Sequence, residues 1–268
     1  MIKKFIEEVR LFQILYEDMN FYNIELNELL LQYINKYIKY KQITAEEFKV
    51  NYENFLRQYT RDSKKYIKSN IYPAIENGIT YDISREEYDI FLLLSTILTQ
   101  HRYDIMSEIY SHKIKNNRAL IIGSGVGIEL ELIKDTYKEI DAYDITIDKF
   151  CNKNHVDVNF YEKEFIGNSD NLYDDIYIIE LLEHVSTPYE LISKAKKTMK
   201  INGRVIITLA VNIPQFDHVI NFNNMNLFLK EIDDLNLFIS YQNEIKHNYL
   251  MSGLNKSSNI FMILELKK

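Results

Sequence analysis

The sequence lacks features that would link the chain covalently or place it in a membrane. Its 268 residues include a single cysteine, Cys151, so no disulfide can form within the chain. No apolar stretch reaches the roughly 20 residues that a membrane-spanning helix needs. The first residues, Met-Ile-Lys-Lys-Phe-Ile-Glu-Glu, lack the unbroken apolar core of a signal peptide. We therefore expect a cytoplasmic protein that does not enter a membrane.

The sequence also lacks an excess of positive charge. The chain has 32 Lys and Arg against 39 Asp and Glu, a formal net charge of −7, and the lysines are scattered rather than gathered in a stripe. A partner with a phosphate backbone is therefore not expected, because nothing in the sequence would release its counterions. The length suits one large domain, or a catalytic domain with a smaller companion. Heavy use of Lys, Ile, Asn and Tyr indicates A- and T-rich coding, which suggests a bacterial source.

The pattern of the chain changes near residue 115. Before it the apolar period is helical, and four helices are predicted, over 2–19, over 24–41, from residue 44 onward and over 85–112. Two of them begin with a Thr or Ser followed three residues later by Glu, at Thr44 and Ser84, which fits a capping box. Residues 61–83 are interpreted as a connecting loop. His101 and Arg102 are interpreted as part of a solvated helix face.

After residue 115, apolar runs alternate with helical patterns, as in a parallel sheet. Seven strands are predicted, near 118–122, 139–144, 156–161, 174–180, 203–211, 236–244 and 258–266. The connection over 245–257 has no helical period and is too short for a parallel crossover. Strands six and seven should therefore pair antiparallel.

The first predicted strand runs into three alternating glycines, Gly123, Gly125 and Gly127. Glycine lets the backbone pass close to a ligand with positive φ, and the helix that follows presents unpaired N–H groups. Asp144 comes 21 residues after Gly123 and closes the second strand, where an acidic residue bonds a ribose diol in dinucleotide-type folds. The spacing disfavours NAD, because Ile128 stands where Gly-x-Gly-x-x-Gly/Ala requires a small residue.

The loop Gly-Ser-Gly-Val-Gly at 123–127 resembles that of class I S-adenosylmethionine (SAM)-dependent methyltransferases. Two further segments carry the resemblance: residues 173–185, with Asp-Asp-Ile followed by Leu-Leu-Glu-His-Val, are similar to the family's fourth-strand segment, and Asn202-Gly203 to its turn before strand five. It covers residues 116–268. The family implies an α/β, Rossmann-like seven-stranded sheet with an antiparallel last strand, here preceded by an all-helical N-terminal domain. We divide the chain into a substrate-selecting helical cap, 1–115, and a SAM-binding domain, 116–268.

The resemblance implies an enzyme that transfers a methyl group from SAM, leaving S-adenosylhomocysteine (SAH), to an oxygen or nitrogen of a small-molecule metabolite. We also consider a homodimer possible. The family places one acid beside the adenine, here Glu162 or Glu164. The residues expected to bind the cofactor are Gly123, Ser124, Gly125, Gly127, Asp144, Ile145, Glu162, Glu164 and Glu180.

Methyl transfer is an in-line displacement, for which the protein mainly supplies alignment and exclusion of water. A hydroxyl or amine acceptor also gains from a base within hydrogen-bond reach, and histidine has a suitable pKa. His184, after strand four, and His218, in the loop after strand five, are the catalytic candidates, because ligands of open α/β sheets bind at the carboxyl edge. The alternative for each is a structural hydrogen-bonding role.

Glu180, Glu183 and His184 also suggest a metal. If the chain turns helical after strand four, the three lie on one face and could hold a divalent cation. The same Glu-x-x-Glu-His spacing appears in ubiquinone-pathway O-methyltransferases, where a metal orients a catechol. We prefer a site without metal, in which Glu180 contacts the cofactor or caps the turn and Glu183-His184 are the ordinary sequence of this turn.

One position departs from the family. Most members have Asp or Glu two residues before the first glycine, where this chain has Ile121. Either another acid substitutes, or the methionine end of the cofactor sits differently. The departure keeps two alternatives open: a nicotianamine-synthase-like enzyme that transfers the aminocarboxypropyl arm of SAM, and a catalytically inactive SAM-binding partner or sensor protein. The Leu-Glu-His-Val turn favours methyl transfer.

Overall fold

The computed structural model describes residues 1–73, 84–167, 172–247 and 257–267. Before residue 115, helices make up its regular structure. Their bounds are α1 Ile2–Glu8, α2 Arg10–Glu17, α3 Ile24–Lys41, α4 Ala45–Ser69, α6 Arg85–Leu98 and α7 Gln100–His112. Both predicted capping boxes are confirmed, at the starts of α4 and α6. At Thr44, for example, the hydroxyl accepts from the N–H of Glu47 while the Glu47 carboxylate accepts from the N–H of Thr44.

Three of the predicted helix boundaries are wrong. The segment predicted over 2–19 is two helices separated at Val9, and the segment over 85–112 is two helices separated at Thr99. Both residues are β-branched and extended, with ψ of 105° and 113°, so the hydrogen-bond ladder is interrupted there. The predicted loop over 61–83 begins too early, because α4 continues to Ser69. The rest of that prediction, over 74–83, lies outside the described residues.

The second half of the chain forms the predicted seven-stranded sheet, in the order β3-β2-β1-β4-β5-β7-β6. The bounds are β1 Asn116–Ile122, β2 Tyr137–Asp144, β3 Val158–Glu162, β4 Tyr173–Ile178, β5 Met199–Val211, β6 Leu237–Lys246 and β7 Ser258–Leu266. The first five are parallel, and β7 pairs antiparallel with both β5 and β6. The predicted reversal of the last strand is therefore confirmed.

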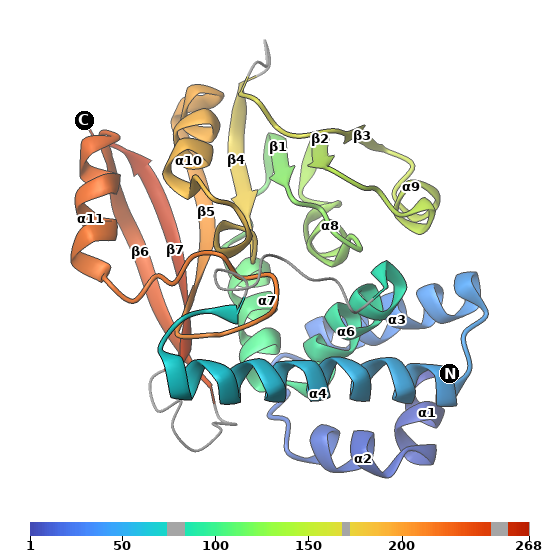
Figure 1. Ribbon diagram of the computed structural model, residues 1–268. Coiled ribbons are helices and arrows are strands. Elements are labelled where there is room, and N and C mark those ends of the chain that lie inside the picture. The colour runs from blue at the N-terminus through green and yellow to red at the C-terminus, as the bar shows by residue number, and fades with distance from the viewer. Residues whose placement is uncertain (74–83, 168–171, 248–256, 268) are drawn as a thin grey trace.

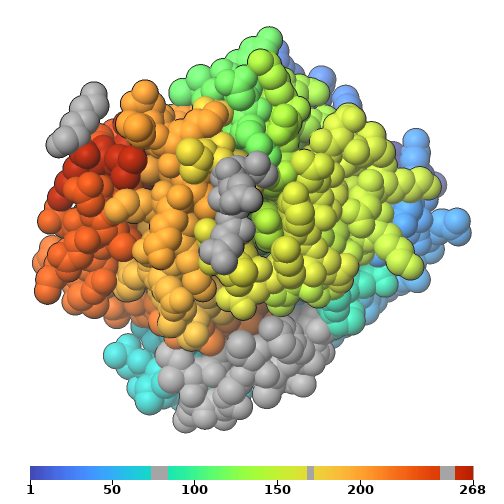
Figure 2. Space-filling view, turned by 90° about the horizontal axis from the view of Figure 1, so that it is seen from above, coloured from blue at the N-terminus to red at the C-terminus, as the bar shows by residue number. Residues whose placement is uncertain are grey.

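Helices cover both faces of the sheet. Alternate strand residues point to opposite sides, so Ile121 packs with α3, α6, α7 and α8 (Ile128–Ile133), whereas Leu120 packs with α10 (Pro188–Lys197) and α11 (Met225–Asp234). Helix α9 (Lys149–Asn154) adds Phe150 to the hydrophobic cluster that contains Ile121. In Figure 1 the N-terminal helices gather below the sheet. In the view from above, in Figure 2, the blue residues of these helices are visible only at the rim of the molecule.

The two halves of the chain share one hydrophobic core, since residues of α1 to α4 and of the strands belong to the same buried cluster. A division at residue 115 into cap and cofactor domain thus stays a prediction. In the described part of the chain, no helix combines the length and apolar character needed to cross a membrane.

Candidate active site

A cavity of about 910 Å³ lies at the carboxyl ends of the parallel strands. This is the edge where open α/β sheets bind ligands, because the strand ends and their loops converge there. Its floor includes Gly123 after β1, Asp144 at the end of β2 and Glu180 after β4. Aromatic side chains from α4 and α6 contribute the facing wall, among them Phe55, Tyr59, Tyr88 and Phe91.

The glycine loop has the backbone that its sequence predicts. Gly123, Gly125 and Gly127 have φ of 78°, 51° and 82°, which side-chain-bearing residues rarely adopt. A Cβ on Gly127 would lie 2.7 Å from the hydroxyl of Tyr33 in α3, whereas a Cβ on Gly125 would meet nothing within 4 Å. Glycine is therefore required at position 127 because a side chain would clash there. At position 125 it is required for the backbone conformation, since the space beside it is open.

Asp144 holds this loop in place. One of its carboxylate oxygens accepts from the N–H of Gly125 at 2.8 Å, and the other accepts from the N–H of Thr146 at 3.0 Å. A carboxylate offers about four lone-pair sites, so each oxygen keeps capacity for a ligand. Asp144 lines the cavity, and the ribose contact stays a prediction.

The structure brings most of the predicted cofactor residues to the cavity, but not all. Gly123, Gly125, Asp144, Ile145, Glu164 and Glu180 line it. Ser124, Gly127 and Glu162 are not among the lining residues: Ser124 is buried, Gly127 packs on α3, and Glu162 is exposed at the end of β3. Of the two acids considered for the adenine, Glu164 is thus the one at the cavity.

The interpretation of His101 and Arg102 as a solvated helix face is wrong. The break at Thr99 redirects the first turn of α7, and both residues line the cavity with exposures of only 7% and 6%. The guanidinium Nη1 of Arg102 lies 3.1 Å from Oε2 of Glu180, while the other oxygen of Glu180 accepts from Asn259 at 2.8 Å. Sequence periodicity could not reveal this, because it continues across Thr99.

Glu180 sits in an unusual backbone position. Its φ is 49°, in the left-handed region, and its N–H donates to the hydroxyl of Thr208 on β5 at 2.6 Å. A second carboxylate, Glu129 in the first turn of α8, also lines the cavity. Burial raises the pKa of Glu129, and the charge of Arg102 opposes that rise. Arg102 is therefore a buried cation that interacts with two cavity carboxylates.

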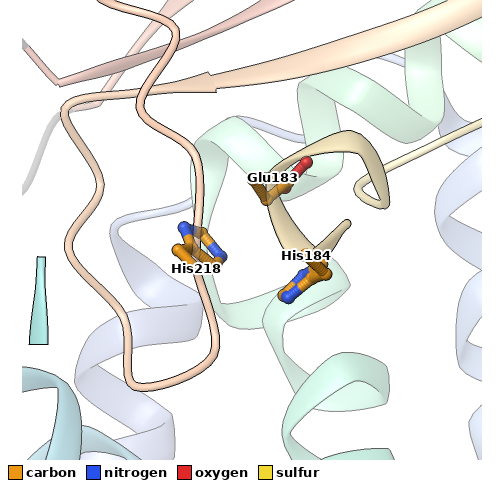
Figure 3. A group of neighbouring side chains, drawn as sticks. All are labelled: Glu183, His184 and His218. Atoms are coloured by element: carbon orange, nitrogen blue, oxygen red, sulfur yellow. The ribbon is translucent and has the colours of Figure 1, made fainter. Parts of the chain in front are cut away.

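A second polar group lies on the wall formed by the loops after β4 and β5. Glu183 and His184 belong to a single 3-10 turn, Leu182–His184, and His218 comes from the loop between β5 and α11. Figure 3 shows the three side chains and the two segments that carry them. The backbone N–H groups of Val219 and Ile220 donate to the carbonyl of Glu183 at 2.8 and 3.1 Å, which fastens one segment to the other.

Both histidines are held through Nδ1. In His184 this atom lies 3.3 Å from a carboxylate oxygen of Asp217, whose other oxygen accepts from Gln215 at 2.8 Å. In His218 it lies 2.8 Å from the carbonyl of Ile213, which can only accept, so Nδ1 carries the proton. The ring centroids are 4.7 Å apart, nearly at right angles.

Burial dominates the electrostatics of this group. It lowers the pKa of His218 to about 3, with the charge of His184 adding to the effect. For His184, burial alone would lower the pKa, but the carboxylates of Asp217 and Glu183 outweigh it and the net shift is upward. Burial, assisted by the charge of Glu180, raises the pKa of Glu183 to about 8.

The predicted metal set does not form as expected. The chain does not continue into an α-helix after β4, since only Leu182–His184 form a 3-10 turn and Glu180 lies before it. Glu180 uses both carboxylate oxygens on Arg102 and Asn259. His218 takes its place beside Glu183 and His184, and one ligating atom from each of these three lies within 4.8 Å of the others.

The sheet order with a reversed β7, the glycine loop and the acid closing β2 together define the class I fold of SAM-dependent methyltransferases. A family model described as a methyltransferase domain matches residues 97–253, and the chain belongs to that family. SAM is the methyl donor of the class, which confirms the predicted cofactor. The match begins within α6, so it includes Arg102 and all of α7.

Solved structures support the same fold at low sequence identity. N-methyltransferase NodS from Bradyrhizobium japonicum in complex with SAH is 10% identical, with a TM-score of 0.51 over 81% of this chain and 99% of that chain. The mitomycin 7-O-methyltransferase MmcR is 8% identical, with a TM-score of 0.54 over 78% and 67% of the two chains. A 1,6-didemethyltoxoflavin-N1-methyltransferase from Burkholderia thailandensis is 10% identical, with a TM-score of 0.51 over 62% and 77%. The comparison with curated proteins found no match by sequence.

Proposed function

We propose that this methyltransferase acts on a small-molecule metabolite whose accepting atom lies against Glu183, His184 and His218. One observation carries the proposal: the same cavity is lined by the glycine loop with Asp144 and by His184 with His218. A donor held at the loop and an acceptor held at the histidines would therefore meet inside one enclosure. Such an arrangement supplies the alignment and water exclusion that in-line methyl transfer requires.

The cofactor's ribose is assigned to Asp144, whose carboxylate is already oriented by two backbone N–H groups. Ile145 follows it at the cavity with 75% of its surface exposed, so its apolar side chain is available for contact with the adenine ring. Glu164 lies close by at the same cavity. Their positions at one cavity support the roles proposed for them.

The methionine end of SAM is assigned to Arg102, Glu129 and Glu180. This end is a zwitterion, with one carboxylate and one ammonium group, and the cavity wall presents one guanidinium with two carboxylates. Nε of Arg102 is buried without a hydrogen-bond partner, so the guanidinium has donor capacity to spare. These side chains would bind the methionine end of the cofactor in place of the acid that most family members have at the position of Ile121.

The acceptor is proposed to be small because of the space that it must share. A volume of about 910 Å³ is near the upper end of the roughly 300–1,000 Å³ typical of ligand pockets, and the cofactor takes part of it. The aromatic wall from α4 and α6 suits a compact, partly apolar molecule. Two structural neighbours are named for acceptors of this kind, mitomycin and 1,6-didemethyltoxoflavin.

Binding of SAH by calorimetry tests the cofactor half of the proposal. Asp144→Ala should weaken SAH binding by about 10- to 100-fold, since each hydrogen bond to a charged group contributes about 1.5–3 kcal/mol and water replaces part of it. Glu162→Ala is the matched control, because this acid ends the neighbouring strand outside the cavity. Equal SAH affinity in Asp144→Ala and wild type would remove Asp144 from the site.

Product analysis across a panel of hydroxyl- and amine-bearing metabolites tests the reaction. Methyl transfer leaves SAH, whereas transfer of the aminocarboxypropyl arm leaves methylthioadenosine. Release of methylthioadenosine would contradict the proposal in favour of that alternative. SAH binding without any product, together with stable co-purification of another chain, would instead indicate an inactive partner protein.

A further inference from the structure

We propose that Glu183, His184 and His218 bind a divalent transition-metal cation that holds a hydroxyl group of the acceptor. The cation site depends only on the side chains of the loops after β4 and β5. The role given to the acceptor rests on the methyl transfer proposed above, and it selects oxygen rather than nitrogen as the methylated atom.

The first support is geometric. The three ligating atoms lie within 4.8 Å of one another. In a tetrahedral site, bonds of about 2.0–2.2 Å place two ligands about 3.3–3.6 Å apart, so side-chain rotations that move these atoms by up to about 1.5 Å would close the site. The backbone bonds from Val219 and Ile220 to Glu183 already hold the two segments at this spacing.

The second support is the orientation of the imidazoles. A metal-bound histidine donates its other ring N–H to a carboxylate or a backbone carbonyl, which fixes the tautomer. His218 meets the backbone version of this rule through Ile213, and His184 meets it through the carbonyl of Asp217, whose carboxylate lies equally close to Nδ1. In both rings Nδ1 is thus occupied, and the lone pair of Nε2 is left for a ligand.

The third support is an unsatisfied carboxylate. Oε2 of Glu183 is buried without a hydrogen-bond partner, and the residue is only 1% exposed. In the described ranges, the cavity carboxylate Glu180 is paired with Arg102, but no Lys or Arg forms an ion pair with Glu183. Ionising a buried carboxyl group is costly unless a cation or donors compensate the charge. A bound metal ion would supply that charge where the chain does not.

The ligand set indicates the kind of metal. Two imidazole nitrogens and one carboxylate oxygen favour Zn²⁺, Mn²⁺ or Fe²⁺, whereas Mg²⁺ and Ca²⁺ prefer oxygen ligands alone. Three protein ligands leave coordination positions open for substrate. A cation held there would lower the pKa of a bound hydroxyl, whose proton would pass to solvent. The hydroxyl oxygen then attacks the methyl carbon, the new C–O bond forms as the C–S bond breaks, and the electron pair passes to the sulfonium sulfur, leaving neutral SAH.

Calorimetric titration of the full chain, freed of metal with a chelator and dialysed, tests the site. We expect Zn²⁺ and Mn²⁺ each to bind at one site per chain, with Mg²⁺ much weaker. Mutation of a residue that only orients a metal ligand typically weakens metal binding by roughly 10- to 100-fold. Loss of a ligand itself should have a larger effect, so His218→Gln and Glu183→Gln should each weaken metal binding by more than that. His112→Gln is the matched control, since this histidine lies at the end of α7 and does not line the cavity.

SAH titrations on the same samples show whether each variant is folded and separate the two proposals. Wild type that binds SAH but no Zn²⁺ or Mn²⁺, or folded His218→Gln and Glu183→Gln variants that bind them as tightly as wild type, would overturn the metal site and leave the proposed methyl transfer standing. Metal binding without SAH binding would overturn the proposed function instead. For the acceptor role, turnover of hydroxyl acceptors should fall at least 10-fold in chelator and return with Zn²⁺ or Mn²⁺. Full turnover in chelator would refute that role.

Discussion

Arg102 gives the sharpest test of how the helical half of the chain completes the cofactor site. Its guanidinium is buried and lies 3.1 Å from the carboxylate of Glu180. Arg102→Met keeps most of the length and apolar surface of the side chain but removes the charge. It should therefore both destabilise the fold and weaken binding of SAH, for two separable reasons.

The loss of stability follows from the carboxylate left behind. Removing one partner of a buried ion pair costs about 3–5 kcal/mol. Glu180 is 19% exposed and keeps its bond from Asn259, so the lower end, about 3 kcal/mol, applies. At roughly 2–4 °C per kcal/mol for a chain of this size, the melting temperature should fall by about 6–12 °C. The lost charge-assisted bond to SAH, about 1.5–3 kcal/mol, should raise the Kd by about 10- to 150-fold.

A double-mutant cycle separates the pair from simple loss of packing. Adding Glu180→Gln to Arg102→Met removes the carboxylate charge that has lost its partner. The loss of unfolding free energy in the double variant, measured with denaturant, should therefore be smaller than the sum of the two single losses by about 0.5–3 kcal/mol. Arg57→Met, in a largely exposed pair with Glu53, should change stability by no more than about 1 kcal/mol. A coupling near zero, or an SAH affinity equal to wild type, would show that Arg102 neither supports Glu180 nor contacts the cofactor.

Two further predictions concern the contact between α3 and the glycine loop. Tyr33 donates to the carbonyl of Val126 at 2.7 Å and lies 3.1 Å from Nε2 of His155, so Tyr33→Phe should lower the free energy of unfolding by about 1–3 kcal/mol in urea; an unchanged urea midpoint would contradict this. Burial lowers the pKa of His155 to about 4, although Glu131 opposes the shift. As pH falls from about 6.5 to 4 the unfolded chain binds this proton first, so stability is lost with acid, and His155→Gln should reduce that slope by up to about 1.4 kcal/mol per pH unit in pH-dependent unfolding. A slope identical to wild type would show that His155 is not the group involved.

Local patterns in the sequence were sufficient for much of the fold. Capping boxes at Thr44 and Ser84 depend on residues three apart, and the reversed last strand depends on the length and composition of one connection. The glycine loop and Asp144 follow from chemistry that the backbone requires at those points. Such features can be predicted from the sequence because the interactions that create them lie within one element or one connection.

The rest was decided by contacts between segments far apart in the chain. Arg102 enters the cavity where the helix breaks at Thr99, and its guanidinium pairs there with Glu180, which follows β4. Likewise, sequence spacing grouped Glu180 with Glu183 and His184. In the structure the carboxylate of Glu180 instead pairs with Asn259 and Arg102, and the loop after β5 places His218 beside the other two. The sequence by itself determined the strands, the capped helix starts and the cofactor loop, because these depend on neighbouring residues. The tertiary structure alone decided which charged side chains share the cavity, because burial and pairing depend on segments that meet only after folding.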